Sequence, residues 1–185
     1  MTDLAPSGTR QLWILRHAKA SDAPRGGSDR DRPLTDRGRR DAESLGDALV
    51  AERSPFATQG LLSPDVALCS SAVRTVETAE LVLSRLSPQM SLDSYSSLYG
   101  AEPDTVLLYL REVDESARSV LVVGHNPTVF RLIWNLLAEG SVDRIRLEEL
   151  GFPTSALAIV DLAIERWEDV VDGQGTLTGL FKPPY

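Results

Sequence analysis

Short apolar segments alternate with longer amphipathic segments along this chain, and that alternation constrains its fold more than any other feature. Residues 11–16, 65–69 and 119–123 are short apolar runs of the kind that form buried strands. Apolar residues recur at helical spacing in residues 35–53, 71–86, 103–115 and from 126 onward. Strands and helices that alternate in this way build a parallel sheet with helices packed on it. The sequence therefore predicts an α/β fold, a single three-layer α/β/α sandwich with a mostly parallel central sheet.

Residues with strong preferences for helix ends set the expected boundaries. Thr35 is the expected N-cap of the first helix, and Ser70 or Ser71 that of the second. Pro103 suits the first position of the third helix. These assignments place each helix start shortly after a loop or a strand.

The last part of the chain combines one marked helix start with two β-like segments. Asn126 is the expected N-cap of the fourth helix, with Pro127 in its first position and Gly140 as its C-terminal cap. Residues 156–164 and 176–181 are β-like and are joined through a glycine-containing turn. We expect them to close the sheet as a hairpin with an antiparallel edge.

Length and composition indicate one globular domain. The chain has 185 residues, of which 42% are hydrophobic and 25% charged. We expect a single domain over residues 10–185 after a flexible tail over residues 1–9. No segment approaches the ~20 apolar residues of a membrane span, and residues 1–10 lack the apolar core of a signal peptide, which predicts a cytoplasmic protein without membrane partners. The net charge of −8 argues against nucleic acid as a partner.

The single cysteine and the histidine spacing limit the chemistry. One cysteine, Cys69, excludes an internal disulfide and any zinc site with two or more thiolates. Cys69 to Arg74 is one residue shorter than the Cys-x5-Arg loop of tyrosine phosphatases and contains no glycine, so we expect Cys69 to be a small apolar strand residue. The chain has no HxH or HExxH spacing, and basic neighbours oppose a cation, so we expect neither a metal nor another cofactor.

Both histidines follow apolar strands. His17 comes directly after residues 11–16, and His125 lies just beyond residues 119–123. Arg16 precedes His17, and Arg74 falls in the expected first turn of a helix, whose N-terminus favours anions. Ligands of open α/β sheets bind beyond the carboxyl ends of the strands. The four side chains are therefore predicted to meet in an anion site matched to a phosphoryl group.

Each of these residues also has a structural interpretation. A single histidine is more often a hydrogen-bonded structural residue than a catalyst, and Arg16 or Arg74 could form surface ion pairs. Residues 16–40 carry eight basic and four acidic side chains, which either draw an anion or form a solvated face. The anion site explains all four positions together, whereas the structural interpretation needs four coincidences at strand ends.

Four sequence blocks resemble the histidine phosphatase superfamily, the phosphoglycerate mutase-like group, and within it the small SixA-like phosphohistidine phosphatases. The blocks are Leu15-Arg16-His17-Ala18-Lys19, Arg32-Pro33-Leu34-Thr35-Asp36-Arg37-Gly38, Cys69-Ser70-Ser71-Ala72-Val73-Arg74-Thr75 and Val123-Gly124-His125-Asn126-Pro127. Ala18 stands where the family has glycine, an exchange that is free of strain where the backbone φ is negative.

The resemblance implies a metal-independent phosphatase with a phosphohistidine enzyme intermediate. It implies that His17 takes the phosphoryl group, that Arg16 and Arg74 clamp its oxygens, and that His125 completes the site. Arg32 resembles an additional phosphate contact. The loop over residues 21–32 is expected to flank the site.

The leaving group narrows the implied substrate. Larger members of the superfamily carry a carboxylic acid that protonates an alkoxide, and between Pro88 and Pro103 this chain offers only Asp93 and Glu102. Without such an acid, phosphohistidine in a protein is favoured, because its imidazole leaves with less help. Two alternatives stay open: a phosphomonoesterase of broad specificity for small phosphate-bearing molecules, and a phosphate-binding module without catalysis.

Overall fold

A six-stranded sheet organises the molecule. The computed structural model describes residues 8–51, 63–87, 89–90 and 92–185. The strands lie in the order β3-β2-β4-β1-β5-β6. Their bounds are β1 Arg10–Arg16, β2 Val66–Ser70, β3 Asp93–Tyr95, β4 Ser119–Gly124, β5 Leu157–Leu162 and β6 Gly175–Phe181. β1 to β4 are parallel, β5 pairs antiparallel with β1, and β6 pairs antiparallel with β5. The sheet is thus mostly parallel with an antiparallel edge, as predicted.

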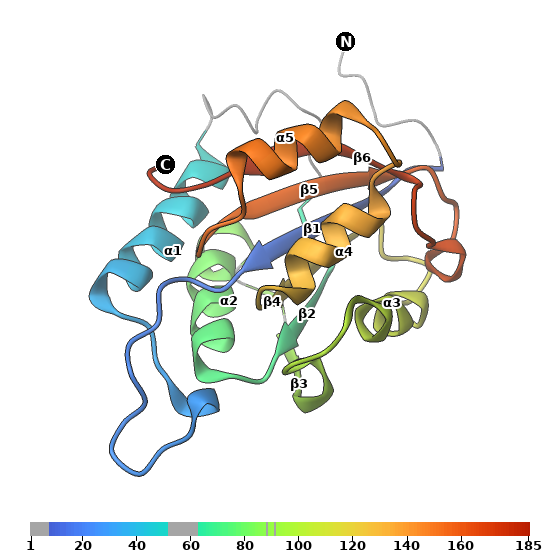
Figure 1. Cartoon of the computed structure of the whole chain (residues 1–185). Helices are drawn as coiled ribbons and strands as arrows, with labels where there is room; N and C mark the ends of the chain where they lie inside the picture. Colours follow the sequence, from blue (N-terminus) through green and yellow to red (C-terminus); the bar gives the residue numbers. More distant parts are fainter. Residues whose placement is uncertain (1–7, 52–62, 88, 91) are drawn as a thin grey trace.

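Helices cover both faces of this sheet (Figure 1). Their bounds are α1 Asp36–Val50, α2 Val73–Leu86, α3 Pro103–Arg111, α4 Thr128–Leu136 and α5 Val142–Leu150. α1 and α2 contribute to one hydrophobic cluster, and α3, α4 and α5 to the other. The result is the α/β/α sandwich that the sequence predicts.

The central strand β1 shows why the apolar runs have no alternating pattern. Leu12 and Ile14 enter the cluster under α3, α4 and α5, whereas Trp13 and Leu15 enter the cluster under α1 and α2. All four side chains are at most 2% exposed. A strand covered on both faces must be apolar at every position. Burial of each such side chain stabilises the fold by roughly 1.5–3 kcal/mol.

Several predicted helix ends are confirmed. Thr35 caps α1, because its hydroxyl accepts a hydrogen bond from the Gly38 N–H. Pro103 occupies the first turn of α3, which ends at Arg111 and so is shorter than the expected 103–115. α1 ends at Val50 with Ala51 as its C-cap, short of the expected residue 53, which lies outside the described residues.

Other predicted caps are wrong, because the polar side chains have other partners. The N-cap residue of α2 is Ala72, and Ser70 is hydrogen-bonded to His125 instead. α4 begins at Thr128, one residue later than expected, and the Asn126 amide donates to the Phe152 carbonyl rather than capping a helix. Gly140 lies beyond the end of α4, in the turn that leads to the Ser141 cap of α5.

Two elements were not predicted from the sequence. β3 is three residues long and largely exposed, and α5 lacks a strong apolar stripe because only Leu147 is buried. Segments this short or with so few apolar residues are not detected from the spacing of apolar residues. β5 and β6 form the predicted antiparallel pair.

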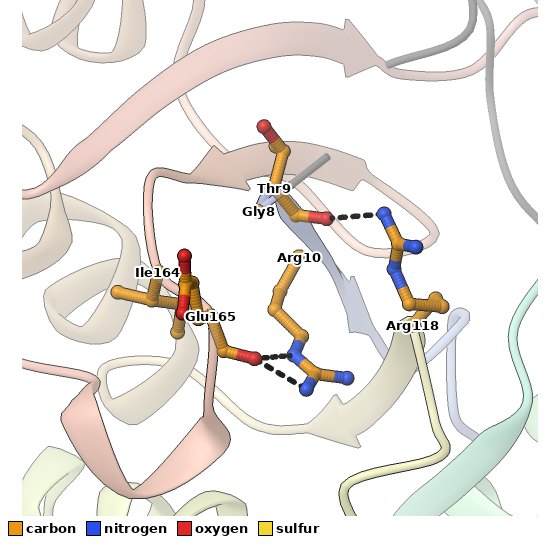
Figure 2. Close-up of a pocket in the computed structure, with 6 residues that line it drawn as sticks. All are labelled: Gly8, Thr9, Arg10, Arg118, Ile164 and Glu165. Carbon is orange, nitrogen blue, oxygen red and sulfur yellow. Dashed lines mark hydrogen bonds between the residues drawn. The ribbon is translucent and has the colours of Figure 1, made fainter. Parts of the chain in front are cut away.

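The N-terminal edge of the parallel strands carries a hollow of about 210 Å³, lined by Gly8, Thr9, Arg10, Arg118, Ile164 and Glu165 (Figure 2). The Arg10 guanidinium donates to the carbonyls of Glu165 and Glu115 at 3.0 and 2.9 Å. Because these protein acceptors already engage Arg10, it anchors the start of β1 here. The predicted tail over residues 1–9 lies mostly outside the described residues. Among the helices that the structure describes, none is long and apolar enough to cross a membrane.

Candidate active site

Strand ends bring the two histidines together. β1 and β4 are parallel with Arg16 opposite Gly124, so the residues that follow lie at the same edge of the sheet. The ring centroids of His17 and His125 are 5.1 Å apart. Arg74 lies in the first turn of α2, next to the end of β2. We call Arg16, His17, Arg74 and His125 the anion cluster.

The His17 ring is held in one tautomer. Its Nδ1 lies 2.7 Å from the Ala18 carbonyl oxygen, which can only accept, so Nδ1 carries the proton. Burial lowers the pKa of His17 to about 4, and the charges of Arg74 and Arg16 add to this effect. At neutral pH the ring is therefore uncharged, with a lone pair on Nε2. This is the state that a nucleophilic imidazole requires.

Ala18 fits the position where the resembling family has glycine. Among the described non-glycine residues, only Ser155 has a positive φ, so Ala18 carries no strain of that kind. Its methyl group is fully buried, and its N–H donates to the Thr78 hydroxyl at 2.9 Å. The backbone that holds the His17 tautomer is thus itself fixed.

His125 is oriented by a buried serine. Its Nε2 lies 2.8 Å from the Ser70 hydroxyl oxygen, and Ser70 is fully buried. Burial, and then the neighbouring His17 and Arg74, lower the pKa of His125 to about 3. A neutral ring that accepts from Ser70 at Nε2 presents Nδ1–H as a donor, and the buried Nδ1 has no protein partner among the described residues. Sequence reasoning assigns Ser70 a different role, as a helix cap.

The two arginines also present unpaired donors. The Arg16 Nη1 donates to the Phe152 carbonyl at 2.9 Å, while the buried Nε atoms of both Arg16 and Arg74 find no partner within the described part of the protein. Buried donors without partners are costly and rare. Three of them in one cluster suit an anion with several acceptor oxygens.

A carboxylate that the sequence analysis did not single out contacts this cluster. Asp29 Oδ2 accepts from Arg74 Nη2 at 3.0 Å, and the Asp29 carbonyl accepts from Arg74 Nη1 at 2.6 Å. The loop over residues 21–32 therefore does flank the site, as expected. The general excess of charge in residues 16–40 pointed to this loop, but not to Asp29.

Arg32 supports the loop. Its Nε donates to the Ser21 carbonyl at 2.7 Å, and its Nη1 forms an ion pair with Asp29 Oδ1 at 3.0 Å. Its charge reaches the cluster, since it is among the causes that lower the pKa of His17. The structure thus gives Arg32 protein partners at the rim of the anion cluster, and a direct phosphate contact stays a prediction.

Tyr99 is a second residue that sequence reasoning missed. Its hydroxyl donates to Asp29 Oδ2 at 2.7 Å, and its ring packs edge-on against His125 with centroids 5.5 Å apart. The Arg30 guanidinium lies 4.6 Å from the centre of the same ring. Tyr99 follows a short 3-10 turn after β3, so no local pattern revealed its contact with the histidines.

The remaining acidic and thiol candidates lie apart from this chemistry. Asp93 is exposed on β3, and Glu102 pairs with Arg131 at 3.3 Å. Cys69 is fully buried, and burial raises the pKa of its thiol to about 12. Cys69 is therefore the strand residue that the sequence predicted, not a thiolate nucleophile.

Fold and site together define an α/β phosphatase. Residues 12–95 match the model of the histidine phosphatase superfamily (branch 1). A protein of Mycobacterium tuberculosis is 34% identical over 171 residues, which cover 91% of this chain and 99% of that protein. The chain belongs to the histidine phosphatase superfamily.

Solved structures agree with this assignment. A putative phosphohistidine phosphatase SixA from Nakamurella multipartitia is similar with a TM-score of 0.78 and 29% identity, covering 98% of this chain and all of that one. The protein histidine phosphatase SixA complexed with tungstate is similar with a TM-score of 0.69 and 28% identity, over 94% of this chain and 97% of that one.

Proposed function

We propose that this protein removes the phosphoryl group from phosphohistidine in a protein, without a metal, through a phosphohistidine intermediate on His17. The observation that carries the proposal is the His17 tautomer: Nδ1–H is bound to the Ala18 carbonyl, which leaves Nε2 as a free base beside unpaired donors. One of the similar SixA structures is a complex with tungstate, a tetrahedral oxyanion like phosphate, and this supports an oxyanion site.

The reaction proceeds in two transfers. In the first, His17 Nε2 forms a bond to phosphorus as the bond from phosphorus to the substrate nitrogen breaks. The donors of Arg16, Arg74 and His125 bind the three equatorial oxygens, where the charge of the loose transition state resides. In the second, water attacks phosphorus, and the electron pair of the P–N bond returns to Nε2. Phosphate leaves, and His17 is again neutral.

The ionisation state of Asp29 favours a substrate whose leaving group needs no proton from an acid. Asp29 is the carboxylate in contact with the cluster, and hydrogen bonds from Tyr99 and Arg32 hold its pKa well below the usual range. An ionised Asp29 has no proton to give to an alkoxide. Phosphohistidine avoids this requirement, which supports it over a simple sugar phosphate.

Replacing the nucleophile by an amide, whose nitrogen can take the place of Nδ1, tests the mechanism. In His17→Asn the side-chain N–H can still donate to the Ala18 carbonyl, whereas no base is left at the position of Nε2. We expect turnover of a phosphohistidine-bearing protein in EDTA to be abolished and the free energy of unfolding to change by less than about 1 kcal/mol. The measurement is phosphate release, together with trapping of an acid-labile, base-stable phosphoenzyme in the wild type.

The alternatives are outcomes of the same assay. Equal or faster turnover of p-nitrophenyl phosphate and sugar phosphates by the wild type would indicate a phosphomonoesterase of broad specificity. A wild type that phosphate protects against heat but that turns over nothing would indicate a phosphate-binding module. Activity of His17→Asn equal to that of the wild type would contradict the nucleophile.

A further inference from the structure

The Asp29 side chain lies between the buried anion cluster and solvent. It forms an ion pair with Arg74 at 3.0 Å, and the Arg74 side chain is 7% exposed whereas that of Asp29 is 52% exposed. A phosphoryl group bound by Arg74 has the Asp29 carboxylate as its neighbour. Asp29 is the exposed partner of this ion pair, so a leaving group that extends from Arg74 toward solvent on this side passes Asp29.

The carboxylate has room for one more hydrogen bond. Oδ2 accepts from Tyr99 and Arg74, and Oδ1 accepts from Arg32. An ionised carboxylate offers about four acceptor positions, so these three donors leave one for a group from outside. Half of the Asp29 side chain faces solvent, where that fourth donor can approach.

The three protein donors also hold the carboxylate in place. They come from the loop itself (Arg32), from α2 (Arg74) and from the turn after β3 (Tyr99). An acceptor tied to three separate parts of the chain is preorganised, which is what recognition of one donor requires. The negative charge of Asp29 extends into the cluster, since it partly offsets the lowering of the His125 pKa.

We infer that Asp29 determines specificity by accepting a hydrogen bond from the leaving imidazole of phosphohistidine, an inference that rests on the proposed function. The ring nitrogen that is not bonded to phosphorus keeps its proton and donates it in a hydrogen bond to Asp29. When His17 Nε2 bonds to phosphorus, the P–N bond of the substrate breaks, and its electron pair stays on the substrate ring. The ring then leaves as neutral imidazole, and no acid is needed.

The same carboxylate disfavours anionic leaving groups. An alkoxide or a nitrophenolate would place a negative oxygen beside an ionised Asp29. Substrates of the two kinds should therefore respond in opposite directions when the charge at residue 29 is removed, which a general loss of structure would not produce.

Asp29→Asn tests this role, with Asp22→Asn as a matched control. Both variants remove one negative charge from the same loop, and Asp22 is exposed to solvent. For Asp29→Asn we expect kcat/KM on a phosphohistidine-bearing protein to fall by about tenfold or more, because a charge-assisted hydrogen bond is lost. We expect kcat/KM on p-nitrophenyl phosphate to be unchanged or higher. Asp22→Asn should keep the wild-type ratio of the two values.

The outcomes separate this inference from the proposed function. Equal losses on both substrates in Asp29→Asn would overturn the specificity role and leave Asp29 as a support for Arg74. A wild type without phosphohistidine turnover or phosphoenzyme would instead overturn the proposed function.

Tyr99→Phe provides a second test of the role of Asp29 if Asp29→Asn does not fold. This substitution removes only the hydroxyl that donates to Oδ2. It should shift the ratio of the two kcat/KM values in the same direction by a smaller factor. An unchanged ratio in a folded Tyr99→Phe protein would contradict the inference.

Discussion

At the scale of single residues, the site depends on which ring nitrogens carry protons. The Ala18 carbonyl sets the tautomer of His17, and the Ser70 hydroxyl fixes the orientation of the His125 ring. Both partners belong to strand ends or to the backbone beside them, so the packing of the sheet fixes the chemistry of the imidazoles. The sequence predicts that both histidines lie at strand ends, but it does not predict the hydrogen-bond partners of their ring nitrogens.

Ser70→Ala should therefore impair catalysis without removing any group that touches phosphate. We expect kcat to fall by about tenfold, because His125 Nε2 loses its hydrogen-bond partner and the ring loses its fixed orientation. Ser94→Ala is the matched control, since Ser94 is an exposed residue of the neighbouring strand β3. Nitrogen NMR shifts of the two histidines, with and without phosphate, report the tautomers directly. Equal activity in the two serine variants would contradict the role of Ser70.

At the scale of elements, the start of α1 is locked to the loop that follows β1. The Thr35 N–H donates to the Lys19 carbonyl at 2.9 Å, and a Cβ placed on Gly38 would lie 2.2 Å from the same oxygen. Lys19 is two residues from His17, so the close approach of α1 braces the backbone beside His17. The glycine in the second sequence block is explained by this contact.

Gly38→Ala should destabilise the protein although alanine is the better helix former. Relief of the clash with Lys19 must shift α1 or the backbone around Lys19, at a cost of about 1–3 kcal/mol, which exceeds the gain in helix propensity of about 1 kcal/mol. Ser44→Ala, at an exposed position of α1, should be neutral or slightly stabilising. Urea unfolding of both variants is the measurement. A gain in stability for Gly38→Ala would show that the backbone contact is easily relaxed.

The elements also show how far sequence reasoning extends. Strongly periodic segments such as α2 and buried runs such as β4 were predicted with nearly correct bounds. The start of α4 was placed one residue early, because Asn126 is engaged by the Phe152 carbonyl, 26 residues away. Asp29 and Tyr99 meet across 70 residues. Contacts of this kind follow from the path of loops in space, which no local preference encodes.

At the scale of the whole molecule, an acidic protein of net charge −8 concentrates unpaired donors at one edge of its sheet. The segment after α5 takes part in this arrangement, because the Phe152 carbonyl accepts from both Arg16 and Asn126. The Ser155 N–H donates to the His17 carbonyl at 3.2 Å. The C-terminal part of the chain thus supports the site besides completing the sheet.

Keeping two histidines neutral in this site should make the stability of the fold depend on pH. Their ordinary pKa is 6.5, and the folded values are about 4 for His17 and about 3 for His125. At pH values between 6.5 and the folded pKa values, the unfolded chain binds more protons than the folded one. The free energy of unfolding therefore falls as the pH drops below about 6.5. Above pH 6.5 these two histidines do not affect it.

His17→Asn isolates one of the two contributions. Between pH 7 and pH 5 the wild type should lose about 1–2 kcal/mol more unfolding free energy than His17→Asn, allowing for partial exposure of the ring. Urea unfolding at both pH values measures this difference. The lower limit of pH 5 keeps Asp29 ionised, because its folded pKa lies well below the usual range and its contribution is lost only at more acidic pH. Identical losses in the two proteins would mean that His17 titrates in the fold as it does in the unfolded chain, and that its free base at neutral pH owes nothing to burial.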